Sequence, residues 1–147
     1  MNFKSFLDKL LAPAPALLPD EDARLALTAL LVRLARSDRS YADVERDRID
    51  RILRSRFGLD TGAAQILREQ GEGLEAAAPD TVRFTRALKE AVPYEDRIGV
   101  IEALWQVALA DGRRDDDEDA LIRLAASLLG VNDVDSARAR QRAEGRG

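Results

Sequence analysis

One pattern of apolar and acidic residues occurs twice in this chain, and the two copies lie 73 residues apart. Each copy has an aspartate where an apolar helical pattern stops, and a glutamate seven residues later, where a second helical pattern begins. The same offset relates apolar positions on both sides of the acids, which indicates one helix–loop–helix unit used twice. The matched pairs are Asp38/Asp111, Glu45/Glu118, Leu31/Leu104, Ala35/Ala108 and Ile49/Ile122.

Composition excludes several kinds of functional site. The chain has 147 residues, of which 34% are charged and 46% apolar, and this suits a single globular domain with a core. It contains no Cys and no His, which rules out thiol chemistry, disulfides, zinc fingers and histidine bases. A metal site would have to use oxygen ligands, which favours Ca²⁺, Mg²⁺ or Mn²⁺ over Zn²⁺. The net charge of −4 argues against nucleic acid as a partner.

Apolar residues recur with helical spacing along most of the chain, and no window shows the alternation of a half-buried strand. Prolines, glycines and acidic caps divide this pattern into separate helices. The sequence therefore predicts an all-α fold, a single compact bundle of six or seven helices with a pseudo-two-fold internal repeat. The expected first residues or caps of the helices are Asp20, Asp43, Asp60 or Thr61, Pro79, Tyr94, Asp115, and Asn132 or Asp133.

The two ends of the chain are expected to differ from the bundle. Residues 1–19 are interpreted as an amphipathic helix with a proline-rich linker, and residues 20–135 as the helical domain. Inside that domain, Gly71 and Gly73 are expected to weaken the end of the third helix. Residues 136–147 are rich in Arg and have few apolar side chains, so this tail is expected to fray.

The paired acids have two competing explanations. Helix capping is the simpler one, because Asp115 is followed three residues later by Glu118, the spacing of a capping box. Against capping, Asp38 and Asp111 lie at expected helix C-termini, where the helix dipole disfavours an anion by roughly 0.3–1 kcal/mol. In the first copy, moreover, Ala42 stands where a capping side chain is needed.

A divalent cation between the aspartate and the glutamate would remove the unfavourable charge and explain why both acids occur in both copies. An acidic patch that faces a protein partner is a third interpretation. An EF-hand is excluded, because the loop counted from Asp111 has Arg113 at a ligand position and Asp116 where that motif needs Gly.

The second junction, Val107–Gly112 with Glu118, resembles the tellurite-resistance TerB-like family, and the first junction is similar to a degenerate copy of it. The segments Phe84–Leu88, Glu95–Ile98 and Leu104–Trp105 are similar to the uncharacterised bacterial branch of that family. The resemblance covers roughly residues 20–133.

The resemblance implies a pseudo-symmetric helical fold, an acidic metal-chelating site, and a role in stress responses with protein partners, membrane-associated ones included. Arg39, where the family usually has glycine, and Ala42 depart from its pattern, so the first half-site is expected to be the weaker one. The candidate metal ligands that the resemblance implies are Asp38, Glu45, Asp111, Glu118 and Asp115.

The first eleven residues carry an apolar stripe with the spacing of one helical face, beside Lys4 and Lys9. Two interpretations stay open: packing on the protein's own bundle, or binding to a protein partner or a membrane surface. A signal peptide is excluded because Asp8 and Lys9 interrupt the apolar stretch, so we expect a cytoplasmic protein, including one peripheral to the inner membrane. The candidate partner-binding residues are Phe3, Phe6, Leu7 and Leu10, with Leu11 completing the stripe.

Other features are interpreted as structural. Trp105 continues the apolar stripe of its helix, so it is assigned to the core rather than to a ligand platform. Five arginines crowd one helix and are taken as a solvated face, with a basic docking surface as the alternative. We expect no enzyme, because the paired carboxylates of a metal-dependent hydrolase come without a nucleophile, oxyanion hole or phosphate loop. These arginines are Arg46, Arg48, Arg51, Arg54 and Arg56.

Overall fold

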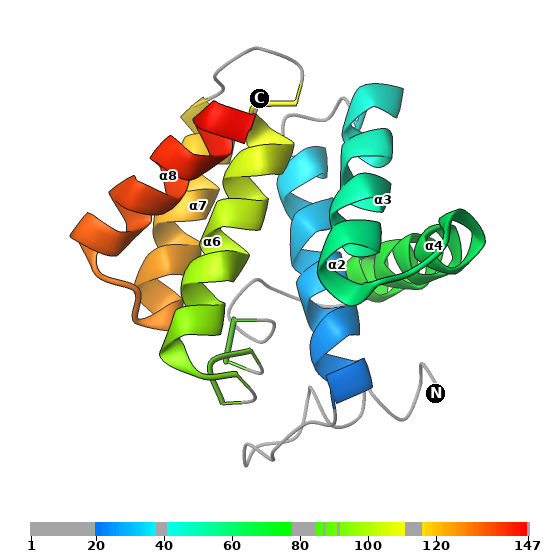
Figure 1. Cartoon of the computed structure of the whole chain (residues 1–147), viewed down its shortest axis with the longest axis horizontal. Helices are drawn as coiled ribbons and strands as arrows, with labels where there is room; N and C mark the ends of the chain where they lie inside the picture. The colour runs from blue at the N-terminus through cyan, green and yellow to red at the C-terminus, as the bar shows by residue number, and fades with distance from the viewer. Residues whose placement is uncertain are drawn as a thin grey trace.

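The structure, a computed structural model, describes residues 20–37, 41–77, 85–86, 88–90, 92–110 and 116–146. Within these ranges the chain is helical and has no strand, so the predicted all-α fold is confirmed (Figure 1). The helices are α2 (Asp20–Arg36), α3 (Asp43–Phe57), α4 (Thr61–Ala77), α6 (Tyr94–Ala108), α7 (Asp116–Leu129) and α8 (Asp133–Arg146).

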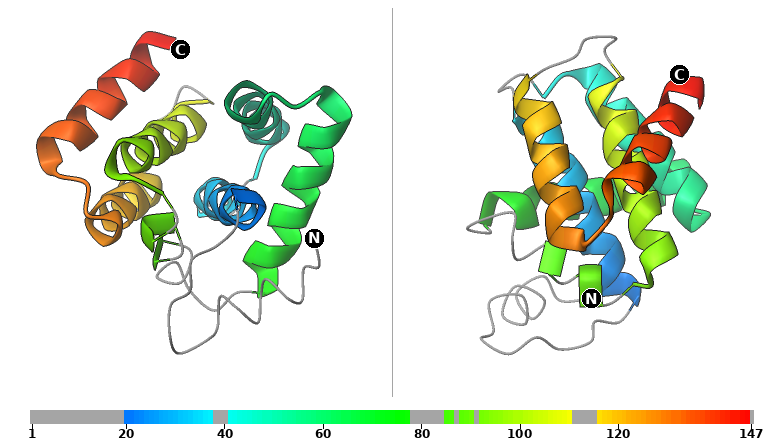
Figure 2. Two further views of the ribbon diagram at one scale, coloured as in Figure 1. Left: turned by 60° about the horizontal axis from the view of Figure 1, so that its bottom comes forward. Right: turned by 90° about the vertical axis from the view of Figure 1, so that its left-hand side faces the viewer.

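Helices α2 and α6 lie next to each other at the centre of the bundle, and the other described helices surround them (Figure 2). Both α3 and α7 contact this central pair. Helix α4 packs along α2 on one side and α8 packs along α6 on the opposite side, and these two pairs make the most extensive helix contacts. The arrangement repeats, because α2, α3 and α4 correspond to α6, α7 and α8 by an approximate two-fold rotation (Figure 2, left).

The buried positions follow the same repeat. Leu31 and Leu104 are both fully buried, and so are Ile49 and Ile122. Trp105 is 6% exposed, which confirms its predicted place in the core. Each fully buried leucine contributes about 1.5–3 kcal/mol to folding, so these repeated positions are a main source of stability.

The offset of the repeat falls from 73 to 72 residues between the start and the end of α7. Helix α3 has 15 residues and α7 has 14, so the glycines that end them, Gly58 and Gly130, lie 72 residues apart. Both have positive φ, 63° and 72°, which a glycine adopts without strain. The next helices then begin alike, because Asp60 and Asn132 each accept a hydrogen bond at 2.8 Å from the backbone N–H three residues on.

The prediction that glycines weaken the end of the third helix is wrong, because α4 continues to Ala77. Gly71 is buried, and a Cβ at this position would lie 2.5 Å from Cγ2 of Thr28 on α2. The glycine therefore allows the backbones of α2 and α4 to come close, and the packing gained there offsets its poor helix propensity.

The prediction of a frayed C-terminal tail is also wrong. Helix α8 extends to Arg146 and packs on α6, with Ala139 and Ala143 almost fully buried. These alanines are four residues apart, so they lie on one face, and their small side chains let α8 approach α6 closely. The interface also includes the Arg140 guanidinium, 5.8 Å from the centre of the Trp105 ring.

The predicted N-terminal helix, with Phe3, Phe6, Leu7 and Leu10, lies outside the described residues. Among the helices that the structure does describe, none has the length and apolar character needed to cross a membrane.

Candidate site at the paired helix junctions

The two acidic junctions belong to the same end of the bundle. Helices α2 and α6 run in the same direction, and α3 and α7 run back beside them (Figures 1 and 2). The C-termini of α2 and α6 and the N-termini of α3 and α7 therefore all lie at one end, which we call the junction end. The sequence did not specify whether the two junctions share an end.

The structure places two of the five candidate ligands. Glu45 is 1% exposed in the first turn of α3, and Glu118 is 2% exposed in the first turn of α7. A helix N-terminus favours a negative charge, but burying a carboxylate is costly unless hydrogen bonds, a cation or both accompany it. Two repeat-related glutamates buried in this way are the strongest chemical feature of the junction end.

Glu45 caps its own helix. Its Oε1 accepts a hydrogen bond of 2.9 Å from the backbone N–H of Ala42, while the Ala42 carbonyl accepts bonds from the N–H groups of Glu45 and Arg46. Ala42 supplies no capping side chain, as the sequence indicates, but Glu45 still caps the helix through the backbone of Ala42. This half of a capping box needs only the backbone N–H of the N-cap residue, and alanine supplies it.

The other candidate ligands, Asp38, Asp111 and Asp115, lie outside the described residues. Among the side chains that the structure does describe, no three His, Cys, Asp or Glu residues come together in a group able to hold a metal ion.

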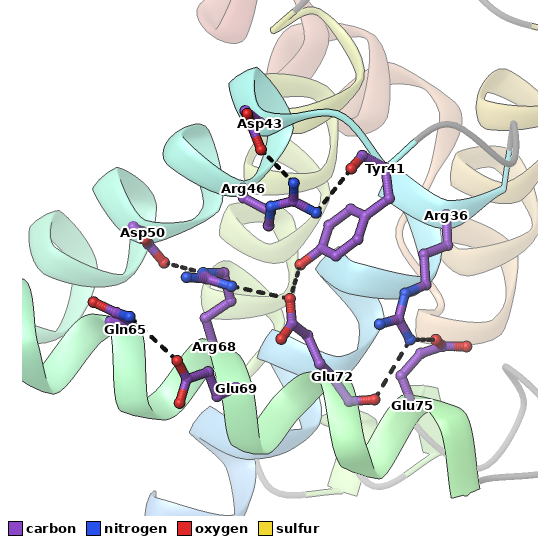
Figure 3. Close-up of polar contacts among 10 residues, drawn as sticks. All are labelled: Arg36, Tyr41, Asp43, Arg46, Asp50, Gln65, Arg68, Glu69, Glu72 and Glu75. Carbon is purple, nitrogen blue, oxygen red and sulfur yellow. Dashed lines mark hydrogen bonds and ion pairs between the residues drawn. The ribbon is translucent and has the colours of Figure 1, made fainter.

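A polar network that the sequence did not predict lies beside the first junction (Figure 3). The hydroxyl of Tyr41 donates a 2.5 Å hydrogen bond to Oε2 of Glu72, which also accepts a 3.0 Å bond from Nη1 of Arg68. Nε of Arg68 donates a 2.6 Å bond to Oδ1 of Asp50. The network joins the start of α3 and its second turn to the middle of α4.

The ring of Tyr41 lies between two guanidinium groups. Those of Arg36 and Arg46 are 5.0 and 4.9 Å from the ring centre, and Arg46 Nη1 also donates to the Tyr41 carbonyl at 3.0 Å. Arg46 forms an ion pair with Asp43 as well. Tyr41 has a φ of 24°, an uncommon conformation for a bulky residue, and these contacts hold it there.

Ionisation in this network follows from its contacts. Burial, with the hydrogen bond to Glu72, raises the pKa of Tyr41 above its ordinary value of 10.0, so the hydroxyl stays protonated at neutral pH. Burial opposes the charge of Arg68, but its bonds to Asp50 and Glu72 prevail and raise the pKa of Arg68.

Two ion pairs join the last turn of α2 to α4. Arg33 Nε and Arg36 Nη1 bind the two carboxylate oxygens of Glu75 at 3.1 and 2.7 Å. Sequence reasoning missed these contacts because the partners lie about forty residues apart. The pairs Arg68–Glu72 and Arg46–Asp43, at the i, i+4 and i, i+3 spacings, did carry a local signal.

The family model described as Tellurite resistance protein TerB matches residues 24–141, a range that includes both junctions. No curated protein and no solved structure matches the chain. The match covers most of the sequence, the all-α fold of the family agrees with the structure, and the match extends beyond residue 133, where the resemblance in the sequence ends. The chain belongs to the TerB family.

Proposed function

We propose that this protein is a non-enzymatic helical module that binds a divalent cation at the junction end and works in a stress-response assembly. The observation that supports the cation most is the pair Glu45 and Glu118, which are related by the repeat, nearly fully buried and at the same end of the bundle. Membership of a family described by tellurite resistance supports the stress-response setting.

The donor chemistry fits a hard cation. Carboxylate oxygens suit Ca²⁺, Mg²⁺ or Mn²⁺, and the chain has no His or Cys to favour zinc. The Oε1 atom of Glu45 accepts the hydrogen bond from Ala42 at the N-terminus of α3, where the helix dipole also favours an anionic ligand group. In this proposal Asp38 completes the half-site of Glu45, while Asp111 and Asp115 complete that of Glu118.

A second candidate function is a metal-free interaction module. The bond between Glu45 and the Ala42 N–H favours it, because capping alone explains why this glutamate is buried. The acidic junction end would then face a protein partner, and Phe3, Phe6, Leu7 and Leu10 would dock on a partner as well. A cytoplasmic protein held at the inner membrane through such a partner fits both candidates.

Thermal melts of the full chain separate the two functions. Chelator-treated protein is melted alone and with Ca²⁺, Mg²⁺, Mn²⁺ or Zn²⁺ at a hundredfold excess over an apparent Kd. Binding to the folded state alone adds about 2.7 kcal/mol, and each kcal/mol raises the midpoint by roughly 2–4 °C in a domain of this size.

The informative variant is Asp111→Asn with Glu118→Gln, and the control is Asp117→Asn, which alters a neighbouring exposed acid. We expect the shift produced by one of the hard cations to be lost in the double variant and kept in the control. A melt that no cation moves would eliminate the metal-binding function and leave the interaction module.

A further inference from the structure

A pocket of about 230 Å³ lies at the end of the bundle opposite to the junction end. Its walls come from the first turns of α2, the last turn of α3, the start of α6 and the segment just before α6. The pocket is smaller than the roughly 300–1,000 Å³ of ordinary small-molecule sites, so it suits one or two apolar side chains. The residues that line it are Ala23, Arg24, Leu27, Arg56, Phe57, Leu88, Val92, Asp96 and Val100.

The rim of this pocket carries both signs of charge. The guanidinium of Arg24 lies 4.8 Å from the centre of the Phe57 ring, and Arg56 Nη1 donates a 3.1 Å hydrogen bond to the carbonyl of Gly99. Asp96 supplies a carboxylate beside these two cations. The pocket therefore suits an amphipathic segment that carries charges on either side of an apolar stripe.

The chain itself provides such a segment at the right distance. The first residue in the chain that lines the pocket is Ala23, near the start of α2. The apolar stripe of the N-terminus ends at Leu11, so the eight residues 12–19 link the stripe to α2. Eight extended residues span at most about 26–29 Å, enough to turn back over the first turn of α2. Three prolines in this linker favour an extended chain.

The composition of that segment matches the pocket. Its stripe offers phenylalanine and leucine side chains, Asp8 has the charge that Arg24 and Arg56 attract, and Lys9 has the charge that Asp96 attracts. The segment precedes the part of the chain that matches the TerB family, whereas nearly the whole pocket lies inside it. The feature would thus be an addition to the family fold.

We propose that residues 3–11 dock in this pocket of their own chain, with Phe6, at the centre of the stripe, as the inserted side chain. The docked segment hides the same apolar stripe that a partner would bind. The docking is independent of the cation, since the pocket and the junctions are at opposite ends of the bundle.

Introduced cysteines test this directly, because the natural chain has none. The full chain with Leu10→Cys and Val92→Cys is equilibrated in a glutathione buffer, and the intramolecular disulfide is quantified by mass spectrometry as an effective concentration. The control pairs Leu10→Cys with Ser55→Cys, an exposed position in the last turn of α3 that is at the same end of the bundle as the pocket but does not line it. A flexible tail reaches both positions by diffusion, so the control measures undirected encounters.

We expect an effective concentration at least tenfold higher for the pocket pair than for the control, and a fall to the control value when Phe6→Ser is added. Equal values for the two pairs would overturn the proposal. So would a disulfide that forms between chains, which would make a second copy the occupant. If Val92→Cys impairs folding, Ala23→Cys on the opposite wall serves as the second position.

Discussion

The matching helix pairs α2/α4 and α6/α8 are joined by different polar contacts. In the first pair, Glu75 of α4 binds Arg33 and Arg36 of α2 at 3.1 and 2.7 Å, and Figure 3 shows the contact with Arg36. In the second pair, buried Ala139 and Ala143 are on the helix that packs on α6. The hydroxyl of Tyr94 donates a 2.8 Å hydrogen bond to Asp135, and the ion pair Arg142–Glu102 is longer, at 3.6 Å. The two halves share a fold, but the ion pairs that hold the outer helix are shorter in the first half.

What the halves share is more informative about function than what distinguishes them. Both keep the buried apolar positions of the central helices, which any duplicated bundle needs. Both halves also keep a buried glutamate at matching positions, Glu45 in the first turn of α3 and Glu118 in the first turn of α7. In the proposed function these shared glutamates bind the cation, whereas in the interaction module they serve only as caps of α3 and α7.

Equal truncations in the two halves should have the largest effect. Leu31→Ala and Leu104→Ala each remove a fully buried leucine from matched positions, and each is expected to cost about 2–5 kcal/mol of unfolding free energy. Urea denaturation measures both. If the loss of unfolding free energy in one variant exceeds that in the other by more than about 2 kcal/mol, the central helices α2 and α6 are not structurally equivalent.

The close approach of α4 to α2 makes Gly71 the next most sensitive position. Gly71→Ala would place a Cβ against Thr28, so we expect a loss of about 1–3 kcal/mol in a chemical melt. The control is Gly62→Ala near the start of the same helix, where a Cβ meets only Asp60 at 3.7 Å. If Gly71→Ala stabilises as an ordinary helical glycine replacement does, the proposed contact is wrong.

The ion pairs Arg68–Glu72 and Arg140–Glu144 occupy matching positions of the repeat, but they should contribute differently to the free energy of unfolding. Arg68 binds Asp50 and Glu72 with its side chain largely buried, so Arg68→Gln is expected to cost about 1.5–3 kcal/mol. Arg140 pairs with Glu144 at 3.5 Å in a more exposed position and lies over the Trp105 ring, so Arg140→Gln should cost about 0.5–1 kcal/mol. Equal losses in thermal or urea melts would contradict the contrast between the halves.

The smallest expected effect is on how the free energy of unfolding depends on alkaline pH, through Tyr41 in the first half. The folded-state pKa of Tyr41 is raised, so its contribution to stability is complete below pH 10.0, its unfolded value, and declines as the pH rises above it. Tyr41→Phe removes this hydroxyl at a cost of about 1 kcal/mol at neutral pH. Urea melts from pH 8 upward should show a shallower alkaline decline for this variant, and an unchanged decline would count against the buried hydroxyl.

Local sequence patterns were enough to predict the helices on either side of the two acidic junctions. Apolar spacing and caps located α2, α3, α6 and α7, and the offset between the acidic pairs predicted the repeat. Tertiary contacts decided the rest. Helix α4 passes Gly71 because it packs on Thr28, and α8 persists because its buried alanines meet α6.

The candidate site was predicted in its residue types but not in its contacts. The sequence singled out Glu45 and Glu118, because their spacing from an aspartate repeats. It did not predict that Glu45 bonds to the backbone of Ala42, since that bond depends on the extended conformation of the N-cap residue. Nor did it predict the Tyr41 network, whose partners come from three separate segments.

The most direct test of a cation at the junction end is isothermal titration calorimetry of chelator-treated full chain with Ca²⁺, Mg²⁺ and Mn²⁺. We predict saturable binding of at least one of these ions, a clear loss of affinity in Glu118→Gln, and no change in Asp117→Asn. A smaller loss of affinity in Glu45→Gln would agree with the expectation that the first half-site binds the cation more weakly. Absence of saturable binding by all three ions to the natural chain would contradict the account and leave the buried glutamates as helix caps.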